Sequence, residues 1–306
     1  MTRPRRLDPG SKVALVAPAS PFRPEDLALG VEELTRIGFE PVYDPRVLER
    51  RGYVAGDAAT RAAVIHDAWA DPSIEALVAI RGGYGTAQVL PLLDPARMLA
   101  ARKLFVGYSD TTALLAFHLA HGLACAHGPM IEGRIARGAE GYDRSSFLAA
   151  VSVPEPMGEL APDGLEILRP GEAAGPLVGG TLTQVAALLG TPFAFDPPPG
   201  AVLFLEDVAE RPYRVDRLFT QLRQAGVLAR ASALVLGEFP RCDEPGGTPA
   251  IRDVLRELTD GFGGPVLFGF PSGHTTGPSW TLPFGVEVRV RASGVPALVV
   301  EEALVD

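Results

Sequence analysis

Along the first half of the chain, short apolar runs alternate with segments whose apolar positions follow a helical period. The runs predict strands and the periodic segments predict amphipathic helices, at 12–17 and 25–37, 40–43 and 58–70, 76–80 and 86–93, and 104–106 and 111–121. Strands and helices that alternate at this spacing form right-handed βαβ units, so the pattern predicts a parallel sheet with helices on both faces. Ligands bind such sheets at the carboxyl ends of the strands.

The helical periodicity is lost between Pro154 and Pro176, where Pro, Gly and acidic residues dominate. Such a change in composition predicts a crossing between domains. We therefore expect an N-terminal α/β domain at 1–150, a linker at 151–165 and a C-terminal domain at 166–306. The second domain is expected to be mixed, with strands at 166–168, 201–205, 233–237, 266–268, 286–290 and 297–300, and helices at 183–189, 215–225 and 251–259.

The net charge of the chain indicates which classes of partner it disfavours. The 306 residues hold 28 Lys and Arg against 37 Asp and Glu, a net charge of −9, so the field repels nucleic acid and anionic membrane surfaces. The N-terminal apolar segment is too short for a signal peptide, and no window has the length of a membrane span. We therefore expect a cytoplasmic protein. Its 2 cysteines are too few for a disulfide framework or a zinc site.

Ser109 lies in Gly107-Tyr-Ser-Asp110, where an apolar strand runs directly into a helical pattern. A serine at such a turn is held outside the sheet, at the positive end of a helix dipole, which favours a nucleophile. The alternative is that Ser109 or Asp110 simply caps the helix, since both residue types are good N-caps. Because Asp110 and Thr111 replace the second half of the Gly-x-Ser-x-Gly pattern, the turn alone leaves both interpretations open.

A serine nucleophile needs a base and a group that orients the base. Glu206 directly follows the apolar strand 201–205, and His274 lies in a loop rich in Gly, Pro, Ser and Thr, so both occupy element ends where function is common. The alternatives are a solvated strand end for Glu206 and a surface histidine without a role for His274.

The other four histidines give weaker signals. His118 and His121 lie three apart on one helix but have no third ligand at a suitable spacing, so packing or surface roles are expected and no metal site is predicted. His66 is expected to be solvated on its helix. His127 lies in a turn that borders the expected crevice, and its role stays open.

A glycine-rich loop, Arg81-Gly-Gly-Tyr-Gly85, follows the third strand. Such a loop can cradle a phosphate, but the dinucleotide fingerprint belongs at the first strand, which here ends in Ala17-Pro-Ala-Ser20, so cofactor binding is disfavoured. The other interpretation is an oxyanion hole, in which the N–H groups of Gly83 and Asp110 donate to a reacting carbonyl oxygen.

Taken together, these motifs resemble the LD-carboxypeptidase family of serine peptidases. They run in family order from Leu7-Asp-Pro-Gly10 to about Val290 and comprise Arg81-Gly-Gly-Tyr-Gly85, Gly107-Tyr-Ser-Asp110, His127-Gly-Pro-Met130, Gly179-Gly180 with Leu189-Gly-Thr-Pro192, Leu203-Phe-Leu-Glu-Asp207 with Pro212-Tyr-Arg-Val-Asp216, Gly237-Glu-Phe239, and Gly273-His274 with Leu282-Pro-Phe-Gly285. The resemblance implies a flavodoxin-like N-terminal domain and a swivelling, barrel-like mixed C-terminal domain. It also implies a homodimer and no metal or cofactor.

For the site, the resemblance implies a triad of Ser109, His274 and Glu206, with Gly83 and Asp110 as oxyanion donors. Arg81, beside the glycines, is a candidate donor to a substrate carboxylate, with a structural salt bridge as the alternative. Thr181 stands where the family often has Asn after its Gly-Gly pair, which bears on specificity.

The activity that the resemblance implies is cytoplasmic hydrolysis of the L,D-amide bond that releases terminal D-alanine from murein tetrapeptides. One alternative within the family is a self-immunity peptidase that cleaves a peptidyl-nucleotide antibiotic of the microcin C type. An alternative of another class is a protein that binds muropeptides without turnover.

Overall fold

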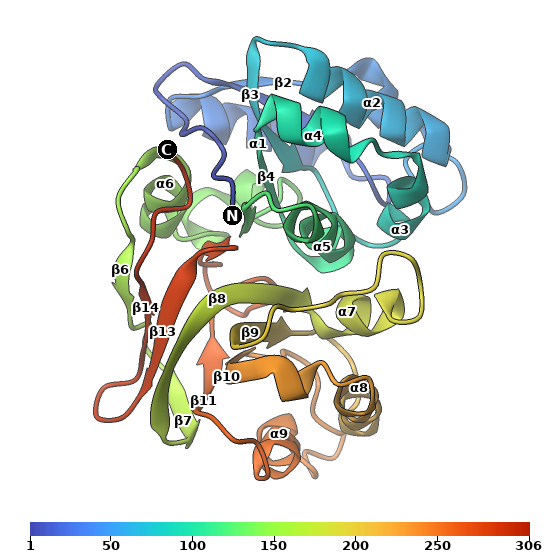
Figure 1. Cartoon of the computed structure of the whole chain (residues 1–306). Coiled ribbons are helices and arrows are strands. Elements are labelled where there is room, and N and C mark those ends of the chain that lie inside the picture. The colour runs from blue at the N-terminus through green and yellow to red at the C-terminus, as the bar shows by residue number, and fades with distance from the viewer.

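The computed structural model describes all 306 residues, which build two sheets (Figure 1). The first sheet has six strands in the order β12-β5-β4-β3-β1-β2, and its first five strands in sequence pair in parallel. This 2-1-3-4-5 order is the flavodoxin-like doubly wound arrangement, as predicted. The strands are β1 (Lys12–Val16), β2 (Glu40–Val42), β3 (Ile74–Ala79), β4 (Leu104–Gly107), β5 (Cys125–His127) and the antiparallel edge strand β12 (Leu282–Phe284).

Helices connect the strands of this first unit. They are α1 (Pro24–Arg36), α2 (Ala58–Ala70), α3 (Thr86–Val89), α4 (Pro95–Ala101), α5 (Thr112–Ala120) and α6 (Arg144–Ser152), with 3-10 turns η1 (Pro45–Leu48), η2 (Leu90–Leu92), η3 (Ser109–Thr111) and η4 (Ile135–Glu140). The single helix expected at 86–93 is broken instead into α3 and η2. Pro91 removes a backbone donor there, and the chain then forms α4, which the pattern did not predict.

The second sheet has eight strands in the order β6-β14-β13-β8-β9-β10-β11-β7. Its strands are β6 (Gly158–Leu160), β7 (Glu166–Arg169), β8 (Gly171–Thr181), β9 (Ala201–Glu206), β10 (Ala231–Gly237), β11 (Val266–Phe270), β13 (Glu287–Ala292) and β14 (Ala297–Val300). The predicted mixed α/β class is confirmed. The barrel-like expectation is corrected, because edge strands β6 and β7 do not pair and the sheet stays open. Its helices are α7 (Leu182–Leu188), α8 (Pro212–Gln224) and α9 (Ile251–Thr259), with η5 (Leu228–Arg230).

The two units are joined by more than one passage of the chain. Strand β12 lies within the expected C-terminal domain but pairs with β5 in the first sheet, and the N–H of Asp306 donates to Pro4 O at 3.1 Å. Strand β6 falls inside the expected linker and pairs with β14. The division at 151–165 stays a prediction, and sheet membership does not follow it at these places.

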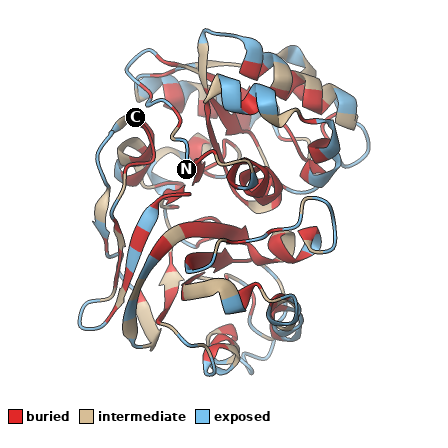
Figure 2. Ribbon diagram, viewed as in Figure 1, coloured by how far each residue is buried: buried red, intermediate tan, exposed pale blue.

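Helix α5 fills the space between the units (Figure 1). Residues 112–119 are all buried, which is the pattern of a helix covered on every side (Figure 2). It packs on β4 and β5 of the first sheet and on β8 and α7 of the second unit. The turn before α5, which contains Ser109, is therefore placed at the boundary between the units. No helix of the fold is long and apolar enough to span a membrane.

Buried His118 gives the fold a pH dependence. Its Nδ1–H donates to Leu114 O at 2.8 Å, its ring stacks on Phe105, and burial lowers its pKa to about 4. An unfolded histidine has a pKa of about 6.5, so this term lowers the free energy of unfolding as pH falls from about 6.5 to 4, by up to about 1.4 kcal/mol per pH unit.

We expect His118→Phe to flatten this pH dependence, because phenylalanine cannot bind a proton in the unfolded state. Urea unfolding at pH 7, 6 and 5 measures the effect. His121→Phe is the matched control, because half-buried His121 makes the same bond to Phe117 O at 2.8 Å. Equal pH slopes for wild type and His118→Phe would contradict the assignment.

Candidate active site

Ser109 occupies a strained turn at the carboxyl end of β4. Its φ is 62°, a left-handed conformation that costs a non-glycine residue on the order of 1 kcal/mol. Its Oγ takes part in no hydrogen bond of the chain. Helix α5 begins with Thr111 as N-cap and has no side-chain cap, so the capping alternative for Ser109 and Asp110 is wrong at this helix. The half-buried hydroxyl is thus left free.

The glycine-rich loop packs directly against this serine turn. A Cβ placed on Gly82 would lie 2.8 Å from both Cβ and Oγ of Ser109 and 3.2 Å from the N atom of Asp110. The Asp110 carboxylate accepts the N–H of Thr86, at the start of α3, at 2.8 Å. The loops after β3 and β4 therefore contact one another, and only glycine fits at position 82 without displacing the serine.

Gly83 has a φ of +101°, and a Cβ there would lie 2.5 Å from Ser20 Oγ. That hydroxyl accepts the N–H of Tyr84 at 3.1 Å and donates to Tyr53 O at 2.9 Å, so it fixes the backbone beside Gly83. The assignment of Gly83 and Asp110 N–H as oxyanion donors stays a prediction. The structure adds that the Cα of Gly82 is directed at the serine and that of Gly83 at Ser20.

Glu206 and His274 are brought together from separate elements of the second unit. Glu206 ends β9 with 0% exposure, and its Oε2 accepts both His274 Nδ1–H at 2.8 Å and the backbone N–H of His274 at 3.0 Å. The solvated strand-end alternative for Glu206 is therefore wrong. Because the Nδ1–H of His274 donates to the carboxylate, Nε2 is the ring nitrogen that can accept a proton.

Burial lowers the pKa of His274, but the Glu206 carboxylate outweighs burial, so the pKa is raised above its ordinary value. In Glu206, burial favours the neutral acid, and the His274 imidazole reverses this effect and holds the pKa of the carboxyl below its usual range. The pair thus favours an ionised carboxylate that stabilises an imidazolium when one forms.

Thr181 is buried, and its hydroxyl donates to Glu206 Oε1. Its backbone N–H donates to Thr112 Oγ1 at 3.1 Å, across the boundary between the units. The structure thus gives Thr181 a role in holding the carboxylate, and any contact with substrate stays a prediction.

Tyr108 connects the serine turn to the histidine. Its ring meets the His274 ring edge-to-face with centroids 5.0 Å apart, and Ser109 is the next residue. No hydrogen bond joins Ser109 Oγ to His274, and such catalytic bonds are often long until substrate is bound. The structure therefore brings the three predicted residues to one boundary, with Glu206 and His274 directly bonded.

His127, whose role was open, lies behind the pair. It is buried, and its Nδ1–H donates to Ser272 Oγ at 3.0 Å, while its Nε2 is buried without a partner. Burial lowers its pKa to about 4, so it stays neutral beside Glu206. A Cβ on Gly273 would lie 2.8 Å from both His127 Cε1 and Glu206 Cδ, which explains why glycine precedes His274.

The structure also bears on two other residues that the sequence analysis singled out, Arg81 and His66. Arg81 forms an ion pair with Glu132, Nε to Oε1 at 3.6 Å, and donates to Pro21 O at 2.6 Å, so the structural alternative for Arg81 is present and its substrate role stays a prediction. His66 is half-buried rather than solvated, because it accepts the N–H of Asp94 at 3.1 Å. No group of three or more His, Cys, Asp and Glu side chains could hold a metal ion.

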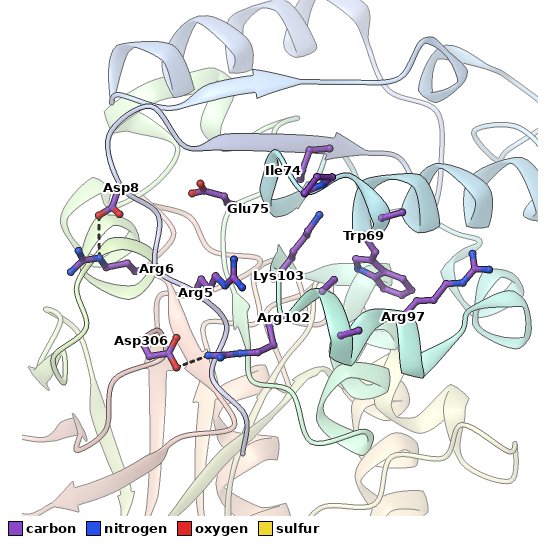
Figure 3. A pocket seen from close by; sticks show the side chains of 14 residues that line it. Arg5, Arg6, Asp8, Trp69, Ile74, Glu75, Arg97, Arg102, Lys103 and Asp306 are labelled. Atoms are coloured by element: carbon purple, nitrogen blue, oxygen red, sulfur yellow. Dashed lines mark hydrogen bonds and ion pairs between the residues drawn. The ribbon is translucent and has the colours of Figure 1, made fainter.

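A large cavity lies elsewhere (Figure 3). It measures about 710 Å³ and lies near the starts of β3 and β4, opposite the strand ends that carry Gly82 and Ser109. Two of its cations already have partners within the protein: Lys103 donates to the carbonyl of Ala68 at 2.7 Å, and Arg102 forms an ion pair with Asp306. The position of the catalytic candidates, rather than cavity size, therefore defines the site.

The raised pKa of His274 predicts the pH dependence of turnover. A general base must be neutral, so kcat/KM should fall as pH drops through the pKa of His274, and this acid limb should lie above the ordinary value of about 6.5. A pH–rate profile in the free-enzyme regime measures it. An acid limb at or below the ordinary value would contradict the assignment of His274 as base.

Two family models match the chain. The LD-carboxypeptidase N-terminal domain matches residues 13–128 and the LD-carboxypeptidase C-terminal domain matches residues 174–290. The fold and these matches define a peptidase. The chain belongs to the LD-carboxypeptidase family.

Individual relatives agree with this membership. A provisionally named carboxypeptidase of Streptomyces coelicolor is 40% identical over 301 residues, 95% of this chain and 94% of the relative. A muramoyltetrapeptide carboxypeptidase from Oxalobacter formigenes has a solved structure with a TM-score of 0.84 and 31% identity, covering 95% of this chain and 99% of that one. The Escherichia coli microcin C7 self-immunity protein MccF is 29% identical over 302 residues, 90% of this chain and 88% of its own. A structure of MccF with aspartyl sulfamoyl adenosine has a TM-score of 0.89, 25% identity and full coverage of both chains.

Proposed function

We propose that the protein is a serine carboxypeptidase that releases terminal D-alanine from murein tetrapeptides, with Ser109, His274 and Glu206 as its triad. The observation that carries the catalytic part is the bond from the buried Glu206 carboxylate to His274 Nδ1 at 2.8 Å, beside a strained serine turn. A carboxylate on Nδ1 selects the tautomer in which Nε2 takes a proton from a hydroxyl.

In the acylation step, Ser109 Oγ attacks the scissile carbonyl carbon while its proton passes to His274 Nε2. The carbonyl oxygen becomes an oxyanion and accepts the N–H groups of Gly83 and Asp110. Collapse of this intermediate breaks the C–N bond, and His274 gives its proton to the leaving amine. Water then attacks the acyl ester with His274 again as base, and Ser109 Oγ recovers its proton as the peptide acid leaves.

The murein substrate is supported by family membership and by the muramoyltetrapeptide carboxypeptidase among the structural relatives. A second candidate is cleavage of an aminoacyl-nucleotide or peptidyl-nucleotide antibiotic, favoured by the MccF structure with aspartyl sulfamoyl adenosine. Both candidates use the same serine chemistry and differ only in what lies on either side of the scissile amide.

The test is incubation with murein tripeptide, tetrapeptide, pentapeptide and an aminoacyl-nucleotide, with products identified by mass spectrometry. We expect the tetrapeptide to be trimmed to tripeptide and the pentapeptide to be cleaved at least about 10²-fold more slowly. An extra terminal residue is sterically blocked, or its carboxylate is left without a hydrogen-bond donor. Arg81 is the proposed donor to the terminal carboxylate of the tetrapeptide. Cleavage confined to the aminoacyl-nucleotide would favour the second candidate, and equal rates on both peptides would remove the murein proposal.

We further propose a cytoplasmic homodimer that acts on small peptides, as the family resemblance implies. Light scattering after size-exclusion chromatography measures the mass directly. A single 32.3 kDa species at micromolar concentration would contradict the dimer without affecting the catalytic assignment.

A further inference from the structure

Arg134 is a buried arginine that belongs to the first unit but holds the histidine loop of the second. It follows β5 and is 8% exposed. One terminal nitrogen donates to Gly273 O and to Thr275 O, each at 2.9 Å, and the other donates to Gly277 O at 3.0 Å. The first two carbonyls belong to the residues on either side of His274, so the guanidinium fixes the backbone that carries the imidazole.

The remaining contacts of Arg134 reach the serine side of the site. Its Nε lies 3.4 Å from Tyr108 Oη, and Tyr108 is both the neighbour of Ser109 and the edge-to-face partner of His274. A further bond runs to Gly141 O at 3.3 Å, within the first unit. One side chain therefore sets the position of the serine turn and of the histidine loop relative to each other.

Arg134 forms no ion pair. All of its hydrogen-bond acceptors are neutral, four carbonyls and a phenol. Burying a cation without a contacting carboxylate is costly, so packing alone does not explain it. The same loop already has a separate anchor on its other side, where the Glu238 carboxylate accepts the N–H and hydroxyl of Thr276, each at 2.8 Å. The carbonyls that the guanidinium fixes, three of them in the histidine loop, account for the residue.

The charge acts on His274. The groups that face this imidazole are the carboxylates of Glu206 and Asp207, the Arg134 guanidinium, the neutral ring of His127 and the phenol of Tyr108. Burial and Arg134 lower the pKa of His274, while the two carboxylates raise it. Arg134 is the cation among these groups, and its effect is smaller than that of the carboxylates, since the pKa of His274 stays above its ordinary value.

We propose that Arg134 is a positioning residue for His274: its guanidinium fixes the histidine loop across the boundary between the two units. This inference rests on the proposed role of His274 as general base. It assigns Arg134 no contact with substrate.

Two substitutions separate position from charge. Arg134→Lys keeps the charge but supplies no planar fork, and Arg134→Met removes both. Arg137→Met is the matched control, because Arg137 lies in the same segment and its exposed side chain forms an ion pair with Glu140 at 3.8 Å, outside the histidine loop. For each variant, kcat and KM are measured on the cleaved peptide, and the histidine ring resonances are titrated by NMR, with His274 assigned from His274→Gln.

For Arg134→Lys we expect kcat to fall about 10²-fold with KM within about 3-fold, since displacement of a catalytic group by about 1 Å costs that much. The His274 titration should stay close to wild type. Arg134→Met should lose more activity, and its His274 titration should move to higher pH because the opposing cation is gone. Arg137→Met should match wild type in both measurements.

Wild-type kcat in Arg134→Lys would overturn the positioning role, and so would an unshifted His274 titration in folded Arg134→Met, because the guanidinium would then not act on the imidazole. If Arg134→Met fails to fold, the same titration on Arg134→Gln decides. The NMR titration does not depend on turnover. A protein that cleaves no peptide would therefore contradict the proposed function, while the titration still tests whether Arg134 governs His274.

Discussion

Ser109→Ala is expected to lower kcat by about 10⁴- to 10⁶-fold, the scale observed when the nucleophile of a triad is removed. The reason lies in the geometry of the turn. The serine hydroxyl makes no bond within the protein, so its removal leaves no buried partner without a hydrogen bond, and the φ of 62° is retained by alanine. The variant should therefore fold as wild type does and lose only chemistry.

The measurement combines release of D-alanine with thermal unfolding, and Ser145→Ala, at an exposed position of α6, serves as control. Ser109→Gly gives a second readout. Glycine adopts a positive φ without strain, so this variant should be equally inactive yet more stable than Ser109→Ala, by on the order of 1 kcal/mol. A folded Ser109→Ala enzyme that keeps more than a tenth of the activity would show that another group is the nucleophile.

The repeated βα units were predictable from the sequence because each carries local signals at its ends. Helix α2 matches the expected 58–70, since Asp57 accepts the N–H of Thr60 as its N-cap, and the apolar period ends at Ala70. The position of the loops after β3 and β4 was also predictable. Parallel topology places the carboxyl ends of neighbouring strands at the same edge of the sheet, whatever side chains the loops carry.

Strand β8 was not predictable from local pattern. Its sequence Gly171–Thr181 contains glycine and proline, which are typical of loops, and its part up to Pro176 falls in the segment whose composition predicts a crossing between domains. Pairing with β13 and β9 makes it a strand. Gly175 and Gly179 are required there, since a Cβ at either position would collide with a backbone carbonyl of Gly200 or Phe204. Tertiary contact overrides propensity in this segment.

The candidate site likewise contains some residues that the sequence indicates and others that only the structure reveals. Ser109, Glu206 and His274 could be selected because each ends an element or lies in a loop. The groups that hold them could not. Thr181 bonds a carboxylate 25 residues away, and Arg134 bonds a carbonyl 139 residues away. The family resemblance marks Thr181 only for specificity, since its bond to Glu206 depends on the pairing of β8 with β9, and no motif marks Arg134, whose role depends on how the two units dock.

His274→Ala is expected to cost about as much activity as Ser109→Ala, and the double variant should be barely worse than either. Residues that act as one unit lose the whole contribution when any essential member is removed. The physical basis is that a proton can leave Ser109 only if the Nε2 of His274 accepts it. Glu206→Gln should cost somewhat less, because the amide can accept the Nδ1–H of His274 but does not stabilise the imidazolium.

Thr181→Val is the matched control for Glu206, because it removes the hydroxyl bond to Oε1 and leaves the bond from Oε2 to His274 Nδ1 in place. Its loss should be far smaller than that of Glu206→Gln. All variants are compared by kcat/KM on the same peptide, with circular dichroism to verify folding. If the losses of Ser109→Ala and His274→Ala multiply in the double variant, the two residues act independently. The contact network that joins Tyr108, His274 and Glu206 would then serve structure rather than proton transfer.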